Sequence, residues 1–156
     1  MDTHETWMAM AFKEAEKAYA KNEIPVGAVI VLENRIIGRG HNQVEMLQDP
    51  TAHAEMIAMT SAVATIGSKW LYGATMYVTL EPCSMCAGAL VLSRMSQLVF
   101  GAGDPKTGAC GSLHNIVQDE RLNHRIEVLR GVMDAKCSAI LKDFFAKLRK
   151  PAPQDN

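Results

Sequence analysis

The sequence MYVTLEPCSMCAGALVL at residues 76–92 passes from an apolar run, through a proline, into a second apolar run. Its first part, Met76 to Leu80, has the apolar character of a buried strand. Pro82 is typical of the first position of a helix, and the pattern predicts that this helix continues through residues 83–92. A strand that leads directly into a helix is half of a parallel βαβ unit, so the region indicates an α/β domain.

The elements on either side continue this alternation of strands and helices. Two apolar runs flank a polar turn at residues 33–35, which predicts a β-hairpin. A polar loop is expected at 42–50, and Thr51 and Asp134 are expected N-caps of the helices that follow them. The sequence predicts a three-layer α/β/α fold with a mixed five-stranded sheet, built from helices at 6–21, 52–66, 83–92 and 134–149 and strands at 26–32, 36–40, 76–80, 97–100 and 126–129.

The composition is that of an ordinary globular protein. The 156 residues include 16 Lys and Arg against 17 Asp and Glu, for a formal net charge of −1, so any basic binding surface must be local. Four cysteines are too few for a disulfide scaffold. No signal-peptide pattern opens the chain, and no apolar run approaches the roughly 20 residues that a membrane span needs. We expect a cytoplasmic protein without membrane attachment, with a single domain at residues 1–150 and a disordered C-terminal tail at 151–156.

His53, Cys83 and Cys86 are the candidate ligands of a zinc ion. The two cysteines are three positions apart, so both thiols can project from one face of a helix's first turn. Unpaired backbone N–H groups there favour thiolates and lower the proton cost of metal binding. If the helix that begins near His53 converges on the same point, one imidazole and two thiolates leave the fourth tetrahedral position of zinc to water.

Other interpretations of these residues remain open at this stage. The cysteine pair also fits a redox motif or two small buried side chains, and a lone histidine at a helix start is often structural. A closed structural zinc site would need a fourth protein ligand. Cys110 and Cys137 are available, but neither has a partner at ligand spacing, so each is expected to be an isolated buried thiol.

Glu55 is the candidate catalytic residue. On an ideal helix, two positions after His53 would place it on the opposite face, so a shared site requires the helix to be only beginning there. An acid beside a zinc-activated water can take the water's proton and deliver it to the substrate. Glu81 is a second nearby carboxylate, for which a structural role at the end of a strand is expected.

Together these motifs resemble a known family. His53-Ala54-Glu55 followed by Pro82-Cys83-Ser84-Met85-Cys86 is similar to the pattern of the zinc-dependent cytidine/adenosine deaminase superfamily. The resemblance covers nearly the whole chain and is greatest to the bacterial tRNA-specific adenosine deaminases. The further segments that carry it are 25–29, 40–42, 49–55, 79–89 and 100–108.

The resemblance implies a cytidine-deaminase-like fold and the conversion of adenosine to inosine at the wobble position of an arginine tRNA anticodon. It implies a homodimer with one zinc ion per subunit, held by His53, Cys83 and Cys86. Glu55 would be the proton shuttle. Asn42 would hydrogen-bond the purine, and Val26 would form part of the pocket wall. The loop after Asn42 departs from the family pattern, because it lacks the basic residue that relatives commonly carry there.

The C-terminal helix suggests where a tRNA anticodon stem-loop would bind. Its predicted core stripe is Cys137, Leu141, Phe144 and Leu148. Phe145 and Arg149 fall off this stripe, with Lys142 on the same side, and an aromatic ring beside cations suits single-stranded RNA. Lysine enrichment for solubility is the alternative. Lys106, in a loop, is a further candidate for an RNA contact.

Three functions are consistent with the sequence. The first is a zinc-dependent tRNA adenosine deaminase. The second is a deaminase of a free base or nucleoside such as guanine or cytosine, which would need a small closed pocket and no role for the last helix. The third is a non-catalytic zinc-stabilised interaction module, in which Glu55 would be dispensable and the zinc would have four protein ligands.

Overall fold

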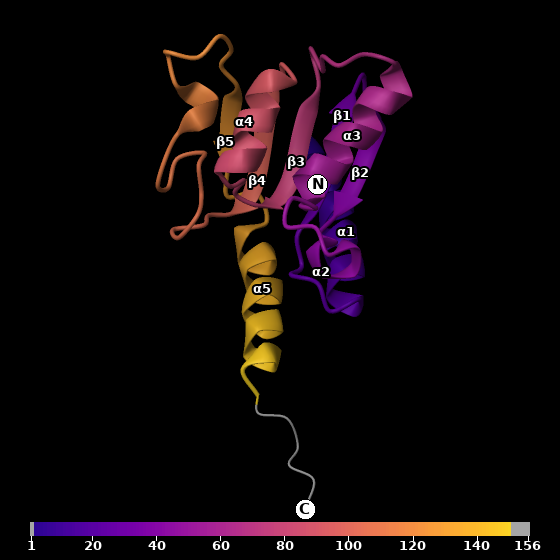
Figure 1. Cartoon of the computed structure of the whole chain (residues 1–156), viewed down its shortest axis with the longest axis vertical. Helices are drawn as coiled ribbons and strands as arrows, with labels where there is room; N and C mark the ends of the chain where they lie inside the picture. Colours follow the sequence, from indigo (N-terminus) through magenta and orange to yellow (C-terminus); the bar gives the residue numbers. More distant parts are fainter. Residues whose placement is uncertain (1, 151–156) are drawn as a thin grey trace, which may run out of the picture.

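The computed structural model describes residues 2–150 and contains a five-stranded sheet in the order β2-β1-β3-β4-β5 (Figure 1). The predicted α/β architecture with a mixed sheet is confirmed, and the tail predicted at 151–156 lies outside the described residues. The helices are α1 (Thr3–Ala20), α2 (Val44–Leu47), α3 (Ala54–Ile66), α4 (Ser84–Leu92) and α5 (Asp134–Leu148), with a 3-10 turn, η1 (Ile116–Gln118). The strands are β1 (Gly27–Leu32), β2 (Arg35–His41), β3 (Thr75–Leu80), β4 (Gln97–Ala102) and β5 (Glu127–Arg130).

The sheet combines an antiparallel half with a parallel half. Strand β1 pairs antiparallel with both β2 and β3, whereas β3, β4 and β5 run parallel. The predicted hairpin is present, and Glu33 and Asn34 form its two-residue turn with φ values of 50° and 61°. Positive φ at both central residues is the geometry that matches the twist of the flanking strands.

Helices cover both faces of the sheet. Helices α3 and α4 pack on one face, over a core that includes Ile30, Met76 and Phe100. Helices α1 and α5 pack on the other, over a core that includes Val29, Tyr77 and Val99. Successive residues of β1, β3 and β4 therefore point to opposite faces and are buried on both, which is the pattern of strands covered on both sides.

Gly40 of β2 allows α3 to approach the sheet very closely. A Cβ at this position would lie 2.3 Å from the carbonyl oxygen of Ala54, the first residue of α3. Only a glycine permits that approach, so Gly40 brings the start of α3 against the end of β2. Residues at these two points, His53 and Asn42, are therefore held near each other.

All four predicted helix starts are wrong, in each case because another residue caps the helix. Helix α1 begins at Thr3, three residues before the predicted start, with Asp2 as its N-cap. Helix α3 begins at Ala54 with His53 as its N-cap, and the hydroxyl of Thr51 donates instead to Asp49 at 2.7 Å. Helix α4 begins at Ser84 with Cys83 as its N-cap, so Pro82 precedes the helix. The other two corrections are that Met133 caps α5 in the left-handed conformation in place of Asp134, and that α2 interrupts the expected loop at 42–50.

The last turns of α5 extend beyond the end of the sheet (Figure 1). Cys137 and Phe144 are buried and Leu141 is half-buried, as the stripe predicted. Leu148 is 63% exposed, so its predicted core position is wrong. Helical periodicity identified the inner face of α5 but not where the sheet beneath it ends. Across residues 2–150, no helix is long and apolar enough to span a membrane.

Candidate metal centre and substrate cavity

The N-termini of α3 and α4 bring His53, Cys83 and Cys86 to one point. His53 and Cys83 are the N-cap residues of the two helices, and Cys86 lies one turn into α4. Nδ1 of His53 is 3.6 Å from Sγ of Cys83 and 3.5 Å from Sγ of Cys86. All three ligand atoms lie within 4.8 Å of one another, and within residues 2–150 they form the one such cluster of three or more metal-binding side chains.

The spacing of this cluster fits a tetrahedral zinc ion. With a nitrogen ligand at about 2.1 Å and a sulfur ligand at about 2.3 Å, tetrahedral geometry separates the two atoms by about 3.6 Å. The two nitrogen-to-sulfur distances have this value. One imidazole and two thiols are also a donor set that zinc prefers. With three protein ligands, one coordination position would remain for water or substrate.

The three side chains shift one another's proton affinity. Hydrogen bonds from Cys86 and His53 lower the pKa of Cys83 to about 3, so its thiolate forms readily. Because Cys86 donates the hydrogen bond to Cys83, this bond raises the pKa of Cys86, and burial raises it further. Hydrogen bonding to the Cys83 sulfur raises the pKa of His53. A cation in this position would replace the shared protons, since metal ligands bind in their deprotonated forms.

Glu55 lies beside this cluster because α3 begins only one residue before it. His53 has an extended backbone, with φ of −76° and ψ of 151°, so the opposite-face relationship of an ideal helix does not apply. The Glu55 side chain is buried, at 4% exposure, and burial raises its pKa above the usual value. The raised pKa favours the protonated form of the carboxyl, which suits a group that takes up a proton and passes it on.

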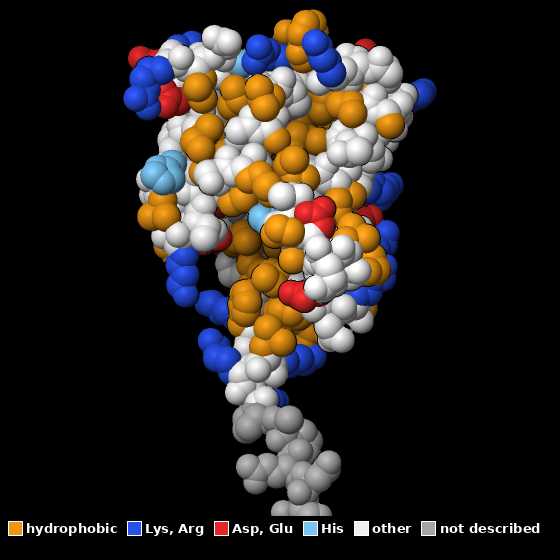
Figure 2. Space-filling model, in the orientation of Figure 1, with side chains coloured by type: hydrophobic (Ala, Val, Ile, Leu, Met, Phe, Trp, Pro, Cys, Tyr) orange, Lys and Arg blue, Asp and Glu red, His pale blue; other side chains and the backbone are white. Residues whose placement is uncertain are grey.

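A cavity of about 710 Å³ opens over the cluster. This size is within the range of small-molecule sites. Figure 2 shows a hollow in this face, bordered by apolar side chains and by Lys or Arg side chains. Eight of the nine predicted site residues line the cavity: Val26, Asn42, His53, Glu55, Cys83, Lys106, Phe145 and Arg149. The ninth, Cys86, is fully buried.

Asn42, which lines this cavity, has an unsatisfied hydrogen-bond acceptor. Its side-chain oxygen Oδ1 is buried and has no hydrogen-bond partner among the described residues. Its backbone N–H donates to the carbonyl of Val26 at 3.1 Å, which ties the two cavity residues together. A buried polar atom without a partner is costly, so its presence in a cavity wall points to a donor supplied by a ligand.

The loop after Asn42 does not line the cavity. It folds into α2, and the buried carboxylate of Glu23 accepts the backbone N–H groups of Glu45 and Met46 at 2.9 and 2.8 Å. In this chain the loop therefore contributes no side chain to the cavity lining.

Glu81 organises the opposite wall. Its carboxylate accepts hydrogen bonds from the backbone N–H groups of Asp104, Cys110 and Ser112, each at 3.0 Å, and from the Ser112 hydroxyl. Burial alone would raise the pKa of Glu81, but these hydrogen bonds lower it below its usual value. Glu81 thus has a structural role, as expected: its hydrogen bonds fix the loop that carries Lys106.

The mouth of the cavity combines an aromatic ring with cations. Phe145 is 39% exposed, and Lys142 and Arg149 are exposed beside it on α5. Sequence reasoning missed Ile24 and Leu80, which belong to the apolar part of the lining. Leu80 ends β3, and ligands of open α/β sheets bind beyond the carboxyl ends of the parallel strands, so this rule could have identified it.

Cys110 and Cys137 are buried and stand apart from the cluster, as predicted. Burial raises the pKa of both thiols, for Cys137 to about 12. A closed structural zinc site would need a fourth protein ligand, and within residues 2–150 the cluster contains only His53, Cys83 and Cys86.

Together these features define the deaminase class: a mixed sheet, two converging helix N-termini, the His-Cys-Cys cluster that they carry and a buried glutamate beside it. A profile of the MafB19-like deaminase family matches residues 2–149. The chain is 51% identical to a tRNA-specific adenosine deaminase of Bacillus subtilis over 96% of this chain and 93% of that one, and 47% identical to one of Aquifex aeolicus over 93% and 95%. A solved structure from studies of A-to-I editing by tRNA:A34 deaminases at the wobble position of transfer RNA has a TM-score of 0.84 and 40% identity, and covers 87% of this chain and 99% of its own. The chain belongs to this deaminase family and, within it, to the tRNA-specific adenosine deaminases.

Proposed function

We propose that this protein converts adenosine to inosine at the wobble position of a tRNA anticodon, with a zinc ion held by His53, Cys83 and Cys86. The observation that carries the proposal is the content of one cavity. It contains the His-Cys-Cys cluster, the buried carboxyl of Glu55, the unpaired oxygen of Asn42 and a cationic, aromatic mouth. The relatives whose names describe this activity support it independently.

Glu55 moves the protons of the reaction. A bound zinc ion supplies Lewis-acid activation of water, the nucleophile that replaces the amine at C6 of adenine. The Glu55 carboxylate accepts a proton from the water and delivers it to N1 of the ring, then transfers the second proton to the leaving amine. Adenosine and water thereby become inosine and ammonia. The burial of Glu55 suits this role, since a raised pKa helps the carboxyl hold the proton between the two transfers.

Asn42 and Val26 orient the base. The unpaired Oδ1 of Asn42 accepts a hydrogen bond from an N–H donor of the purine, and Val26 packs against the ring. A single methyl or ring contact discriminates weakly, whereas a buried hydrogen-bond acceptor rejects bases that leave it unpaired.

Phe145, Arg149 and Lys106 bind the RNA around the target nucleotide. An exposed aromatic ring offers a stacking surface for a neighbouring base, and the two cations face the phosphate backbone. These groups border an open cavity mouth, which favours a polynucleotide over the free guanine or cytosine of the alternative function.

The remaining parts of the proposal concern the assembly. We take residues 1–150 as one deaminase domain that forms a homodimer with one zinc per subunit and acts on an arginine tRNA. Apolar side chains gather on the face over α3 and α4 (Figure 2), where Leu92 is 75% exposed, and this surface suits a second subunit. The cytoplasm suits the activity, because its reducing conditions keep Cys83 and Cys86 available as ligands.

The test is an incubation with an anticodon stem-loop that has adenosine at the wobble position. The expected result is inosine at that position alone, detected after nuclease digestion, with no product from a stem-loop that carries guanosine there. Free adenosine, guanine and cytosine serve as parallel substrates. Turnover of free guanine or cytosine without turnover of the stem-loop would overturn the proposal in favour of the free-base alternative.

A further inference from the structure

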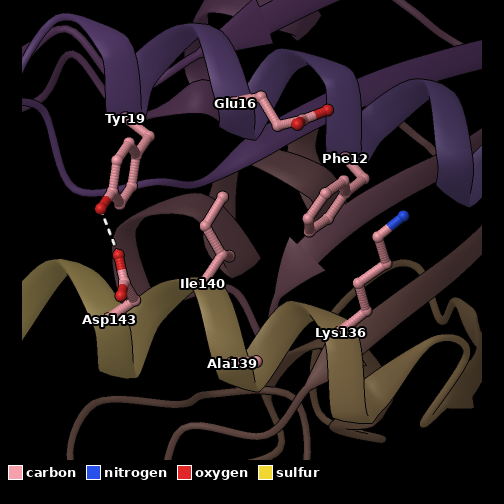
Figure 3. Close-up of a pocket in the computed structure, with 7 residues that line it drawn as sticks. All are labelled: Phe12, Glu16, Tyr19, Lys136, Ala139, Ile140 and Asp143. Carbon is pink, nitrogen blue, oxygen red and sulfur yellow. Dashed lines mark hydrogen bonds between the residues drawn. The ribbon is translucent and has the colours of Figure 1, made fainter.

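Helix α5 separates two hollows on the surface. Its residues Leu141, Lys142 and Phe145 and its C-cap Arg149 line the substrate cavity, at spacings that place them on one flank of the helix. The opposite flank, with Lys136, Ala139, Ile140 and Asp143, lines a groove of about 490 Å³ against Phe12, Glu16 and Tyr19 of α1 (Figure 3).

The C-terminal half of α5 has few anchors of its own. Phe144 is the last of its residues to be buried, and Leu148 beyond it is exposed. Phe145 and Arg149 therefore sit on a part of the helix that the sheet does not support. Their positions depend on what holds the other flank.

That flank is held by Tyr19, which lies in the last turn of α1. Its hydroxyl donates a hydrogen bond to the carboxylate of Asp143, which joins α1 to α5 (Figure 3). The Tyr19 ring packs edge-on against Phe144, with ring centres 6.0 Å apart. The ammonium group of Lys147 lies 4.5 Å from the centre of the Tyr19 ring and 3.8 Å from the Asp143 carboxylate.

Tyr19 is also close in sequence to the cavity wall. Ile24 and Val26, both cavity residues, follow it by five and seven positions. Between them and Tyr19, the backbone N–H of Asn22 donates to the Tyr19 carbonyl at 3.1 Å, and Glu23 is buried. One short segment therefore anchors the apolar wall of the cavity at one end and the outer flank of α5 at the other.

We propose that Tyr19 and Asp143 are a positioning pair for RNA binding: their hydrogen bond fixes the rotation of the α5 end so that Phe145 and Arg149 face the cavity mouth. The inference rests on the proposed function and names residues that touch neither the base nor the cluster. Because Tyr19 and Asp143 lie outside the substrate cavity, they act only through the helix.

The test is the variant Tyr19→Phe, which removes the hydroxyl but keeps the ring against Phe144 and Lys147. The expected result is a KM for the anticodon stem-loop that rises about fivefold, the effect of losing one hydrogen bond, with kcat changed less than about twofold. Backbone amides at 144–150 should exchange with deuterium faster, and zinc content should stay the same. The matched control is Ser138→Ala, which removes a hydroxyl bonded to Asp134 on the same helix at 2.9 Å and should leave KM unchanged.

A double-mutant cycle separates positioning from general loosening. If Tyr19 acts through Phe145, then Tyr19→Phe should have little further effect on KM in a Phe145→Ala background. Additive losses, or an unchanged KM and unchanged amide exchange in the single variant, would overturn the inference. Failure of the proposed function is distinguishable, because then the wild-type protein itself would not deaminate the stem-loop, while the exchange measurement would still report on α5.

Discussion

Nδ1 of His53 lies 3.5 Å from Sγ of Cys86, although 33 positions separate the two residues in the chain. The contact exists because α3 and α4 lie on the same face of the sheet and begin at the same end of it. Each helix places a candidate ligand at its N-terminus, and backbone N–H groups at the start of α4 favour the thiolate forms of Cys83 and Cys86.

Replacing one ligand should abolish metal binding. In Cys86→Ala the remaining imidazole and thiolate are too few to hold zinc, so the zinc content of the purified protein should fall from about one per chain to less than about a tenth. Elemental analysis measures this directly. Cys137→Ala is the matched control, because Cys137 is an equally buried thiol outside the cluster, and it should keep the metal. Full zinc content in Cys86→Ala would exclude Cys86 as a ligand.

Replacing Glu55 should separate metal binding from chemistry. Glu55→Gln keeps the size of the buried side chain but cannot carry a proton, so zinc should remain bound while kcat falls by about 100-fold to 10,000-fold. Single-turnover deamination of the stem-loop, read with the zinc content of the same sample, provides the measurement. Activity within about tenfold of wild type would remove Glu55 from the proton-transfer role.

The parts of this site that the sequence predicts are those encoded by local spacing. Cys83 and Cys86 share a helical turn, and Glu55 was expected to reach the site only if α3 was just beginning, as it is. The exact start of α3 was missed because Thr51, a favoured capping residue, bonds to Asp49 instead. Two local interactions competed for one hydroxyl, and sequence alone does not rank them.

The long-range contacts that hold the site in place leave no recognisable pattern in the sequence. The donors to the Glu81 carboxylate are mostly backbone N–H groups 23 to 31 positions away, and every residue except proline has such a group. The Tyr19–Asp143 contact spans 124 positions between two amphipathic helices. The apolar stripe of α5 was readable from residue 137 to residue 144, but the exposure of Leu148 depends on the length of the sheet.

Removing the Asn42 side chain should weaken substrate binding without weakening the fold. Its Oδ1 has no partner in the described chain, so Asn42→Ala should leave the free energy of unfolding within about 1 kcal/mol of wild type, while KM for the stem-loop rises about tenfold. Urea unfolding and steady-state kinetics test the two halves. Asn115→Ala, at an exposed asparagine outside the cavity lining, should change neither. A large loss of stability with an unchanged KM would assign Asn42 a structural role.

Alkaline pH should destabilise the protein partly through Cys137. Burial raises the pKa of this thiol to about 12, from an unfolded value near 9, so between these values the folded state holds a proton that the unfolded state has lost. Stability from this group is complete below about pH 9 and falls as pH rises, by roughly 1 kcal/mol at about pH 10. The loss of unfolding free energy between about pH 8 and pH 10 should therefore be smaller in Cys137→Ala by that amount. An identical pH dependence in both proteins would contradict the raised pKa.

Glu81→Gln should loosen the loop that carries Lys106. The carboxylate accepts four hydrogen bonds, and Gln keeps one acceptor oxygen but turns a donor toward the N–H groups that the other oxygen served. We expect a loss of about 1–3 kcal/mol in the free energy of unfolding and faster amide exchange at residues 103–112. KM for the stem-loop should rise while zinc content stays near one per chain, because no ligand is altered. Asp119→Asn is the matched control: Asp119 pairs with Arg121 on an exposed loop, so its replacement should affect neither exchange at 103–112 nor KM. If Glu81→Gln lost its zinc but kept a protected loop, then Glu81 would support the metal centre itself and not the substrate loop.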